Sequence, residues 1–367
     1  MRAKAAVTRA LSEPFFMEEI EFDEPAGDEV LVRIVATGIC QTDAHVRNGH
    51  IPVPLPIVLG HEGAGVVECV GPDVTMLHPG DHVVLSYLSC GHCPQCLRAH
   101  GAYCSHALAA NFSGARLDGT RGLRRPDSDE PVFGHFFGQS SFATYALASE
   151  RNAVKVDKDA PLDLLGPLGC SLQTGAGAIL NSFASRPGAT VAILGVGAVG
   201  FGALMAARLV GASTIIAVDI NPQRLKLAEE LGATHTLDPR GTDVGAAIKN
   251  ITRTGAAYVF DTTGRADMLD HAVASLAPMG RIGLVASESD TKVAVAKLAF
   301  GMSVSGIVQG DAISQIFIPT LVQHYRAGRF PIDRLVRFYD FDDIDTAFED
   351  AARGRVIKPV LRIAAAS

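Results

Sequence analysis

Four cysteines lie within fifteen residues of this 367-residue sequence and are its strongest chemical signal. Their spacing is C-x2-C-x2-C-x7-C, and they are Cys90, Cys93, Cys96 and Cys104. Short C-x2-C steps let a loop fold around one ion, and tetrahedral zinc holds four thiolates at about 2.3 Å. Four thiolates leave no open coordination position, so the spacing predicts a structural zinc site. An iron–sulfur cluster and a set of free thiols are the alternatives.

A glycine-rich segment is the second signal. Gly195, Gly197 and Gly200 form GVGAVG after the apolar run TVAIL, and Asp219 ends the next apolar run 19 residues past Gly200. This context predicts a dinucleotide site: a tight turn, a backbone that approaches the pyrophosphate, and close helix–strand packing. Asp219 is expected to bind the adenosine ribose, which favours NAD over NADP, although Arg224 leaves some room for NADP. A glycine-rich packing turn is the alternative.

A third set is dispersed along the chain. Cys40, His61 and Cys170 offer two thiolates and one imidazole, which is a catalytic zinc shell with one position open for water or substrate. Asp43 could hold the other ring nitrogen of His61. Glu62 could be a fourth ligand or a carboxylate that lies behind the ligands. Taken singly, these cysteines could be small buried hydrophobic residues and the histidine an ordinary hydrogen-bonded one.

The surrounding patterns predict the elements that carry these residues. Residues 1 to about 150 hold short β-like runs punctuated by glycine and proline, which is typical of an irregular or barrel-like β domain. From about residue 188, strand and helix patterns alternate at 190–197, 198–212, 214–220, 222–233, 257–264 and 280–287. Such alternation predicts a parallel, doubly wound sheet, so the fold class is α/β. The run VIKPVLRI at 356–363 predicts a strand, and the pattern alone does not show which domain this strand joins.

Composition excludes several classes of protein. The formal net charge of −7 argues against nucleic acid or an anionic membrane as the main partner. The N-terminal segment lacks the features of a signal peptide, so a cytoplasmic location is expected, and seven cysteines then favour metal binding over disulfides. Residues 187–207 carry no charge, but their glycines favour a buried strand–turn–helix over a membrane span.

Joined in one chain, these features resemble the zinc-containing medium-chain alcohol dehydrogenases over nearly all of the sequence. GHEGAGVV, the four-cysteine loop, GVGAVG with VDI, and IKPVL carry the resemblance. FFGQSSFATYA, LLGPLGCSLQTGAGA and RAGRFPIDRLVRFY are similar to the aryl-alcohol (benzyl-type) and allylic terpene-alcohol branch. The resemblance implies a GroES-like catalytic domain over 1–170 and 310–367, a Rossmann NAD-binding domain over 171–309, and an active site in the cleft.

The resemblance also implies roles for individual residues. Cys40, His61 and Cys170 become the ligands of a catalytic zinc. The other implied positions are Thr42 and His45 in a proton relay, Thr174 against the nicotinamide, Lys358 at the pyrophosphate, and Phe136 and Phe137 along the substrate channel. Tyr87, near the cysteine loop, is a further pocket candidate. The alternative is that these three aromatic residues belong to the core.

The expected activity is reversible hydride transfer between a primary aromatic or allylic alcohol and NAD, with zinc as the Lewis acid. Two zinc ions per chain, a small alcohol or aldehyde as partner, and a homodimer or homotetramer are expected. A thiol-adduct formaldehyde dehydrogenase of the same superfamily and a non-catalytic dinucleotide-binding protein are the alternatives. Cys69 has no assigned role and is expected to be a buried structural thiol.

Overall fold

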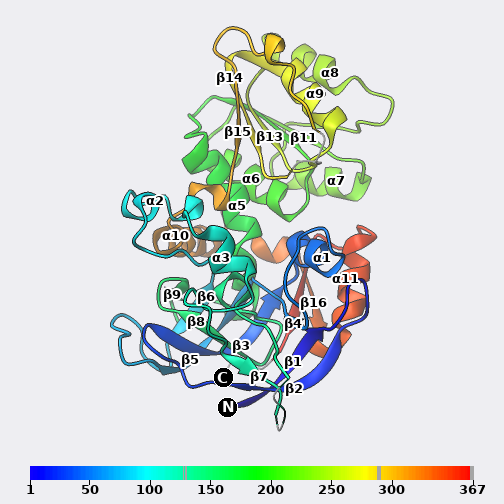
Figure 1. Cartoon of the computed structure of the whole chain (residues 1–367). Coiled ribbons are helices and arrows are strands. Elements are labelled where there is room, and N and C mark those ends of the chain that lie inside the picture. Colours follow the sequence, from blue (N-terminus) through cyan, green and yellow to red (C-terminus); the bar gives the residue numbers. More distant parts are fainter. Residues whose placement is uncertain (127, 129, 287–290, 364–367) are drawn as a thin grey trace. The chain divides into compact units, whose positions relative to one another are not determined.

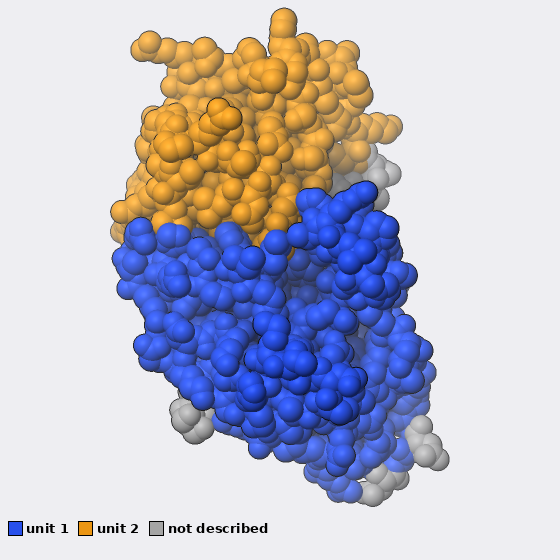
Figure 2. Space-filling view, turned by 90° about the vertical axis from the view of Figure 1, so that its left-hand side faces the viewer, with its two compact units in different colours: residues 1–170, 313–367 blue, residues 171–312 orange. Residues whose placement is uncertain are grey.

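The computed structural model describes residues 1–126, 128, 130–286 and 291–363 (Figure 1). The chain forms two compact units, which Figure 2 distinguishes by colour. Unit 1 comprises Met1–Cys170 and Ile313–Ser367, and unit 2 comprises Ser171–Ala312.

Unit 1 is built on two sheets. The larger one has the strand order β16-β17-β3-β5-β6-β9, with β8 also paired to β3, and the smaller one has the order β4-β1-β2-β7. The strands are β1 Arg2–Thr8, β2 Phe16–Phe22, β3 Glu29–Gly38, β4 Ile57–Val58, β5 Gly63–Val70, β6 His82–Leu85, β7 Leu123–Arg124, β8 Tyr145–Ser149, β9 Ala153–Val156, β16 Val336–Asp340 and β17 Lys358–Arg362. The helices are α1 Gln41–Arg47, α2 Pro94–Leu97, α3 Ala107–Phe112, α4 Leu162–Leu165, α10 Ser314–Arg326 and α11 Ile344–Ala352.

Strand β3 organises the larger sheet. Its side chains are buried except for a half-buried Arg33, as expected for a continuous apolar run. Strand β17 pairs with it in antiparallel register from Val360 opposite Gly38. The run VIKPVLRI is therefore a strand of unit 1, which answers the question of its domain. Cys69, expected to be buried, is instead partly exposed on β5.

Unit 2 is a parallel sheet with the order β12-β11-β10-β13-β14-β15. The strands are β10 Thr190–Leu194, β11 Thr214–Val218, β12 His235–Leu237, β13 Ala256–Asp261, β14 Leu276–Leu284 and β15 Ser303–Gly306. The helices are α5 Ser171–Gly177, α6 Ala198–Leu209, α7 Pro222–Leu231, α8 Val244–Thr252 and α9 Ala266–Ser275. Strands β11 and β12 lie on one side of β10, and β13 lies on the other side. The strand order therefore reverses at β10, and doubly wound sheets bind ligands at such a reversal.

The alternating pattern of the sequence is confirmed as this doubly wound sheet, and the fold class is α/β. Residue 287, the last of the run expected at 280–287, lies outside the described residues. The uncharged stretch at 187–207 is divided between β10 and α6. Within the described ranges, no helix is both long and apolar enough to cross a membrane.

Candidate metal centres and dinucleotide site

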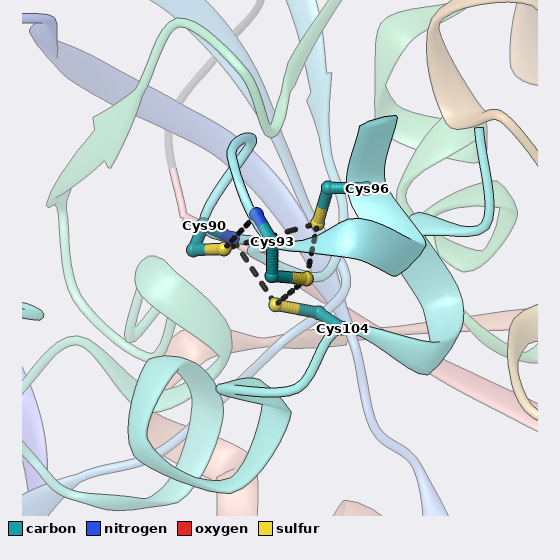
Figure 3. Close-up of side chains that lie close together, drawn as sticks. All are labelled: Cys90, Cys93, Cys96 and Cys104. Carbon is teal, nitrogen blue, oxygen red and sulfur yellow. Dashed lines mark hydrogen bonds between the residues drawn. The ribbon is translucent and has the colours of Figure 1, made fainter. Parts of the chain in front are cut away.

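The four clustered cysteines converge on one point of unit 1 (Figure 3). Their sulfur atoms all lie within 4.8 Å of one another. The Sγ–Sγ distances are 3.9 Å from Cys90 to Cys96, 3.5 Å from Cys93 to Cys96, and 3.9 Å from Cys93 to Cys104. Four thiolates around a tetrahedral zinc would be about 3.8 Å apart. The cluster therefore has the size of a tetrathiolate zinc site, and all seven cysteines of the chain are free of disulfides.

Backbone amides surround these sulfurs. The N–H of Cys93 donates to Sγ of Cys90 at 3.4 Å, and the N–H groups of Cys90 and His106 donate to Sγ of Cys104 at 3.3 Å. The N–H groups of Cys96 and Ser105 lower the pKa of Cys93 to about 5. Such hydrogen bonds stabilise thiolates, the form that binds metal. The loop thus provides the sulfur positions that zinc requires, and its backbone favours the thiolate of Cys93, whereas burial raises the pKa of Cys104 to about 12.

The dispersed residues also meet. Cys40, at the junction of β3 and α1, lies with His61, Glu62 and Cys170, and their ligand atoms are all within 4.8 Å of one another. His61 and Glu62 precede β5, and Cys170 precedes α5. The thiol of Cys170 donates to Cys40, and together with the charges of His61 and Lys358 this holds the pKa of Cys40 well below its usual value.

The orientation of the His61 ring points to a metal ligand. Its Nδ1 lies 2.9 Å from Oδ1 of Asp43, and both side chains are fully buried. Asp43 is itself fixed, because it accepts the backbone N–H groups of Cys40 at 3.0 Å and Gly60 at 3.1 Å. A carboxylate partner places the proton on Nδ1 and leaves the lone pair on Nε2. Among the described residues, Nε2 is buried without a hydrogen-bond partner, and such a group is costly unless something binds it.

The glycine-rich turn of unit 2 has the geometry of a phosphate-binding loop. Gly195 has φ +87°, a conformation that favours glycine, and a Cβ on Gly200 would lie 2.1 Å from the carbonyl oxygen of Gly195. In the described part of the chain, nothing lies within 4 Å of where a Cβ of Gly197 would be. Because Gly197 precedes α6, this open backbone is at the positive end of the helix, where a pyrophosphate fits.

Asp219 stabilises that turn from the end of β11. Its carboxylate accepts the N–H of Val196 at 2.9 Å and the N–H of Asn221 at 2.8 Å. Nη1 of Arg224 lies 3.8 Å from the same carboxylate. The two residues expected at the ribose are therefore neighbours, and the arginine charge is partly balanced by the aspartate. Thr174, on α5, has its hydroxyl 3.5 Å from Oε1 of Gln309.

Comparisons with known proteins identify the family. Residues 26–158 match the alcohol dehydrogenase GroES-like domain, and residues 198–323 match the zinc-binding dehydrogenase domain. A geraniol dehydrogenase of Castellaniella defragrans is 48% identical over 98% of this chain and 97% of the relative. The chain is a zinc-binding medium-chain alcohol dehydrogenase.

Solved structures agree. An alcohol dehydrogenase zinc-binding domain protein from Burkholderia ambifaria is 52% identical, with a TM-score of 0.97 over the whole of both chains. The benzyl alcohol dehydrogenase of Acinetobacter calcoaceticus is 47% identical, with a TM-score of 0.95 over 99% of this chain and 100% of the other. The family binds zinc and NAD(H), and both candidate metal clusters and the glycine-rich loop fit those groups.

In this alcohol dehydrogenase, Lys358 lies in a different place from the one that the resemblance implied. Its Nζ is 2.8 Å from the carbonyl oxygen of Ile39 and 2.9 and 3.1 Å from the two carboxylate oxygens of Glu62. Lys358 is 2% exposed. All three donors of the ammonium group are thus used inside unit 1, which argues against a contact with the pyrophosphate. The pair also occupies both oxygens of Glu62, which favours a carboxylate behind the ligands over a fourth ligand.

The aromatic residues pack around the His61 ring. Phe137 stacks on it with ring centroids 4.4 Å apart, and Phe136 meets it edge-on at 5.5 Å. Both phenylalanines are buried, and Tyr87 is partly buried against the same core cluster. All three are therefore packed in or against the core, and Phe136 and Phe137 also surround the ring of the candidate ligand His61.

The two residues expected in the proton relay lie on α1, and His50, which the sequence analysis did not name, lies just after this helix. The Thr42 hydroxyl is 3.9 Å from Sγ of Cys40. Nδ1 of the half-buried His45 lies 3.1 Å from Nδ1 of the exposed His50. Gly49, with φ +79°, turns the chain so that the N–H of His50 donates to the carbonyl of His45 at 2.8 Å. The HVRNGH segment held a glycine turn signal, but nothing in the spacing showed that the rings would meet.

Proposed function

We propose that this dehydrogenase oxidises primary aromatic or allylic alcohols to aldehydes with NAD, reversibly. The observation that carries the proposal is the cluster of Cys40, His61 and Cys170, in which Nε2 of His61 is left for a metal. The buried phenylalanine rings packed on His61 make the surroundings of this cluster apolar, which suits an apolar substrate better than a charged polyol. The two relatives named for geraniol and benzyl alcohol support the same substrate class.

We propose two zinc ions per chain, one at each candidate cluster. A zinc ion held by Cys40, His61 and Cys170 would act as a Lewis acid and lower the pKa of a bound alcohol. The two thiolates offset the charge of the ion, and Asp43 keeps the His61 lone pair aimed at it. Lys358 neutralises Glu62 behind the ligands, so that an uncompensated buried carboxylate does not add to the charge of the site.

We assign the proton path to α1. The Thr42 hydroxyl accepts the alcohol proton and donates its own onward, and His45 receives it. Burial and the neighbouring charge of His50 lower the pKa of His45, so this imidazole stays neutral and able to accept at neutral pH. The exposed His50, just after α1, takes the proton from His45 when its own imidazole is neutral and releases it to solvent.

This path predicts a pH effect. Replacing His50 with alanine removes a positive charge beside His45, so the pKa of His45 rises. The neutral acceptor is then lost at a higher pH, and the acidic limb of kcat/KM for alcohol oxidation moves to higher pH. Steady-state profiles of the wild type, the His50→Ala variant and a His78→Ala control measure the shift. Superimposable profiles for all three would rule His50 out of the path.

The cofactor preference is assigned to Asp219. The Asp219→Asn variant keeps the size and one acceptor but loses the charge that repels a 2′-phosphate. A hydrogen bond to a charged group is worth about 1.5–3 kcal/mol, so the NAD-to-NADP ratio of kcat/KM is expected to fall by about 10- to 100-fold. Asp270→Asn, on the exposed face of α9, is the control and should leave the ratio unchanged. An unaltered ratio in Asp219→Asn would place the selectivity elsewhere.

The assembly is proposed to be a homodimer or homotetramer. Strand β15 is the edge of the unit 2 sheet, and unpaired edges invite pairing with another chain. Phe300, which is 78% exposed, lies three residues before the start of this strand. Light scattering behind size-exclusion chromatography measures the mass, and a monomer would contradict the proposal. A cytoplasmic location, with no nucleic acid partner, stays a prediction.

The substrate assignment is tested by NADH formation with benzyl alcohol, geraniol, ethanol and thiol-trapped formaldehyde. We expect the first two to give the highest kcat/KM. Preference for the thiol adduct would favour a formaldehyde dehydrogenase. No turnover of any alcohol by protein that binds zinc and NAD would favour the non-catalytic alternative.

A further inference from the structure

A second histidine pair lies on the outside of the four-cysteine loop. His92 and His106 are exposed, and their ring centroids are 5.9 Å apart. One ring nitrogen of each lies within 4.8 Å of the other and of the Cys90 sulfur. One thiolate and two imidazoles are borderline-soft donors of the kind that zinc selects, and water can complete the tetrahedron.

The tautomer of His92 suits a ligand. Its Nδ1 lies 2.9 Å from the carbonyl oxygen of Cys90, an atom that only accepts. Nδ1 therefore carries the proton, and Nε2 holds a free lone pair. The same contact fixes the ring, as a hydrogen bond to a carbonyl commonly does for metal-binding histidines.

Charge also favours a second cation here. Four thiolates around one divalent ion leave a net charge of −2, and backbone N–H groups compensate it unevenly. Cys93 and Cys104 each accept two such donors, whereas among the described residues Cys90, the sulfur next to both histidines, accepts one, from Cys93. A zinc-bound Cys90 sulfur thus keeps electron density for a second ion. That ion would bring the cluster to neutrality.

We propose that Cys90, His92 and His106 form an exchangeable zinc site that shares the Cys90 sulfur with the four-cysteine site. Zinc arriving from solvent binds the exposed histidines first and passes to the cluster by ligand exchange, with no change in oxidation state. The inference rests on the proposed zinc at the four cysteines. The proposed site is a second, solvent-accessible position that binds zinc more weakly, and the zinc of the four-cysteine site enters and leaves through it.

Zinc content measured at two free-zinc levels tests the site. The purified enzyme is equilibrated in a zinc buffer, and metal per chain is determined by elemental analysis. At low free zinc, the wild type and the H92A/H106A variant should hold the same amount. At high free zinc, the wild type gains one further equivalent, and the double variant binds that equivalent at least about tenfold more weakly. The H100A variant, altered in the same loop but outside the histidine pair, should behave as the wild type does.

An exchange measurement tests the path. Loaded enzyme is mixed with isotopically labelled zinc, and the four-cysteine ion should exchange more slowly in H92A/H106A than in the wild type or H100A. Equal zinc content and equal exchange rates in the three proteins would overturn the proposal. Loss of zinc from the double variant at low free zinc would mean damage to the cluster. The H92A and H106A single variants then decide, because each must keep the low-zinc complement and lack the extra equivalent. Wild type that holds no zinc at the four cysteines at low free zinc would instead contradict the proposed structural zinc.

Discussion

Replacing Cys40 with serine is expected to lower kcat/KM for alcohol oxidation by at least about 10³-fold, because a Lewis acid supplies several kcal/mol of transition-state stabilisation. Cys40 contributes one of the two thiolates beside His61, and its low pKa keeps it in the form that binds metal. Serine keeps the shape of the side chain but is a much poorer zinc ligand. The loss should therefore fall on kcat more than on the KM for NAD.

The measurement pairs NADH formation with zinc per chain. Loss of activity together with one zinc equivalent is the expected outcome. Cys69→Ser is the matched control, because Cys69 is a partly exposed thiol on β5 outside both clusters, and it should keep activity and zinc. A Cys40→Ser enzyme that loses its zinc yet keeps wild-type turnover would show that the dispersed cluster is not the catalytic centre.

Replacing Cys104 with serine is expected to destabilise the four-cysteine loop. Metal binding to such a loop is also its folding free energy, about 10–16 kcal/mol in small zinc peptides. Apolar packing of the loop is limited, since α2 is only Pro94–Leu97 and Leu97 is 75% exposed. A fall in Tm on the order of 10 °C is expected.

Limited proteolysis with mapped cleavage sites distinguishes local from global unfolding. Cleavage between residues 90 and 104 should appear first in Cys104→Ser, and addition of a strong chelator should produce the same pattern in the wild type. Cys69→Ser again serves as the control. An unchanged Tm and unchanged cleavage would mean that the cluster does not stabilise the loop.

The sequence predicted those parts of the site that are local in the chain. The spacing of the four cysteines fits one loop, and GVGAVG after TVAIL fits β10, a turn and α6, because short spacings constrain geometry directly. Cys40, His61 and Cys170 are too far apart for spacing to join them. Their residue types suggested a possible zinc shell and the family resemblance implied it, but only the structure shows that their ligand atoms lie together.

Contacts between distant segments could not be predicted. Stacking of Phe137 on His61 depends on how a turn packs against the start of β5, and the pairing of His45 with His50 depends on the turn at Gly49. Lys358 was assigned to the cofactor from its position in a motif. Its actual partner, Glu62, follows from the pairing of β17 with β3, which the pattern did not specify.

The ion pair between Glu62 and Lys358 has a consequence for biosynthesis. The two residues are 296 positions apart, so Glu62 and its neighbouring ligands leave the ribosome long before their cation does. Until residue 358 is made, the carboxylate of Glu62 has no Lys358 to pair with, and burying this carboxylate unpaired is strongly unfavourable. A nascent or truncated chain that ends before this residue is therefore expected to keep the ligand segment open to solvent, to acquire metal poorly and to be degraded. Completion of the catalytic centre is thus coupled to completion of β17.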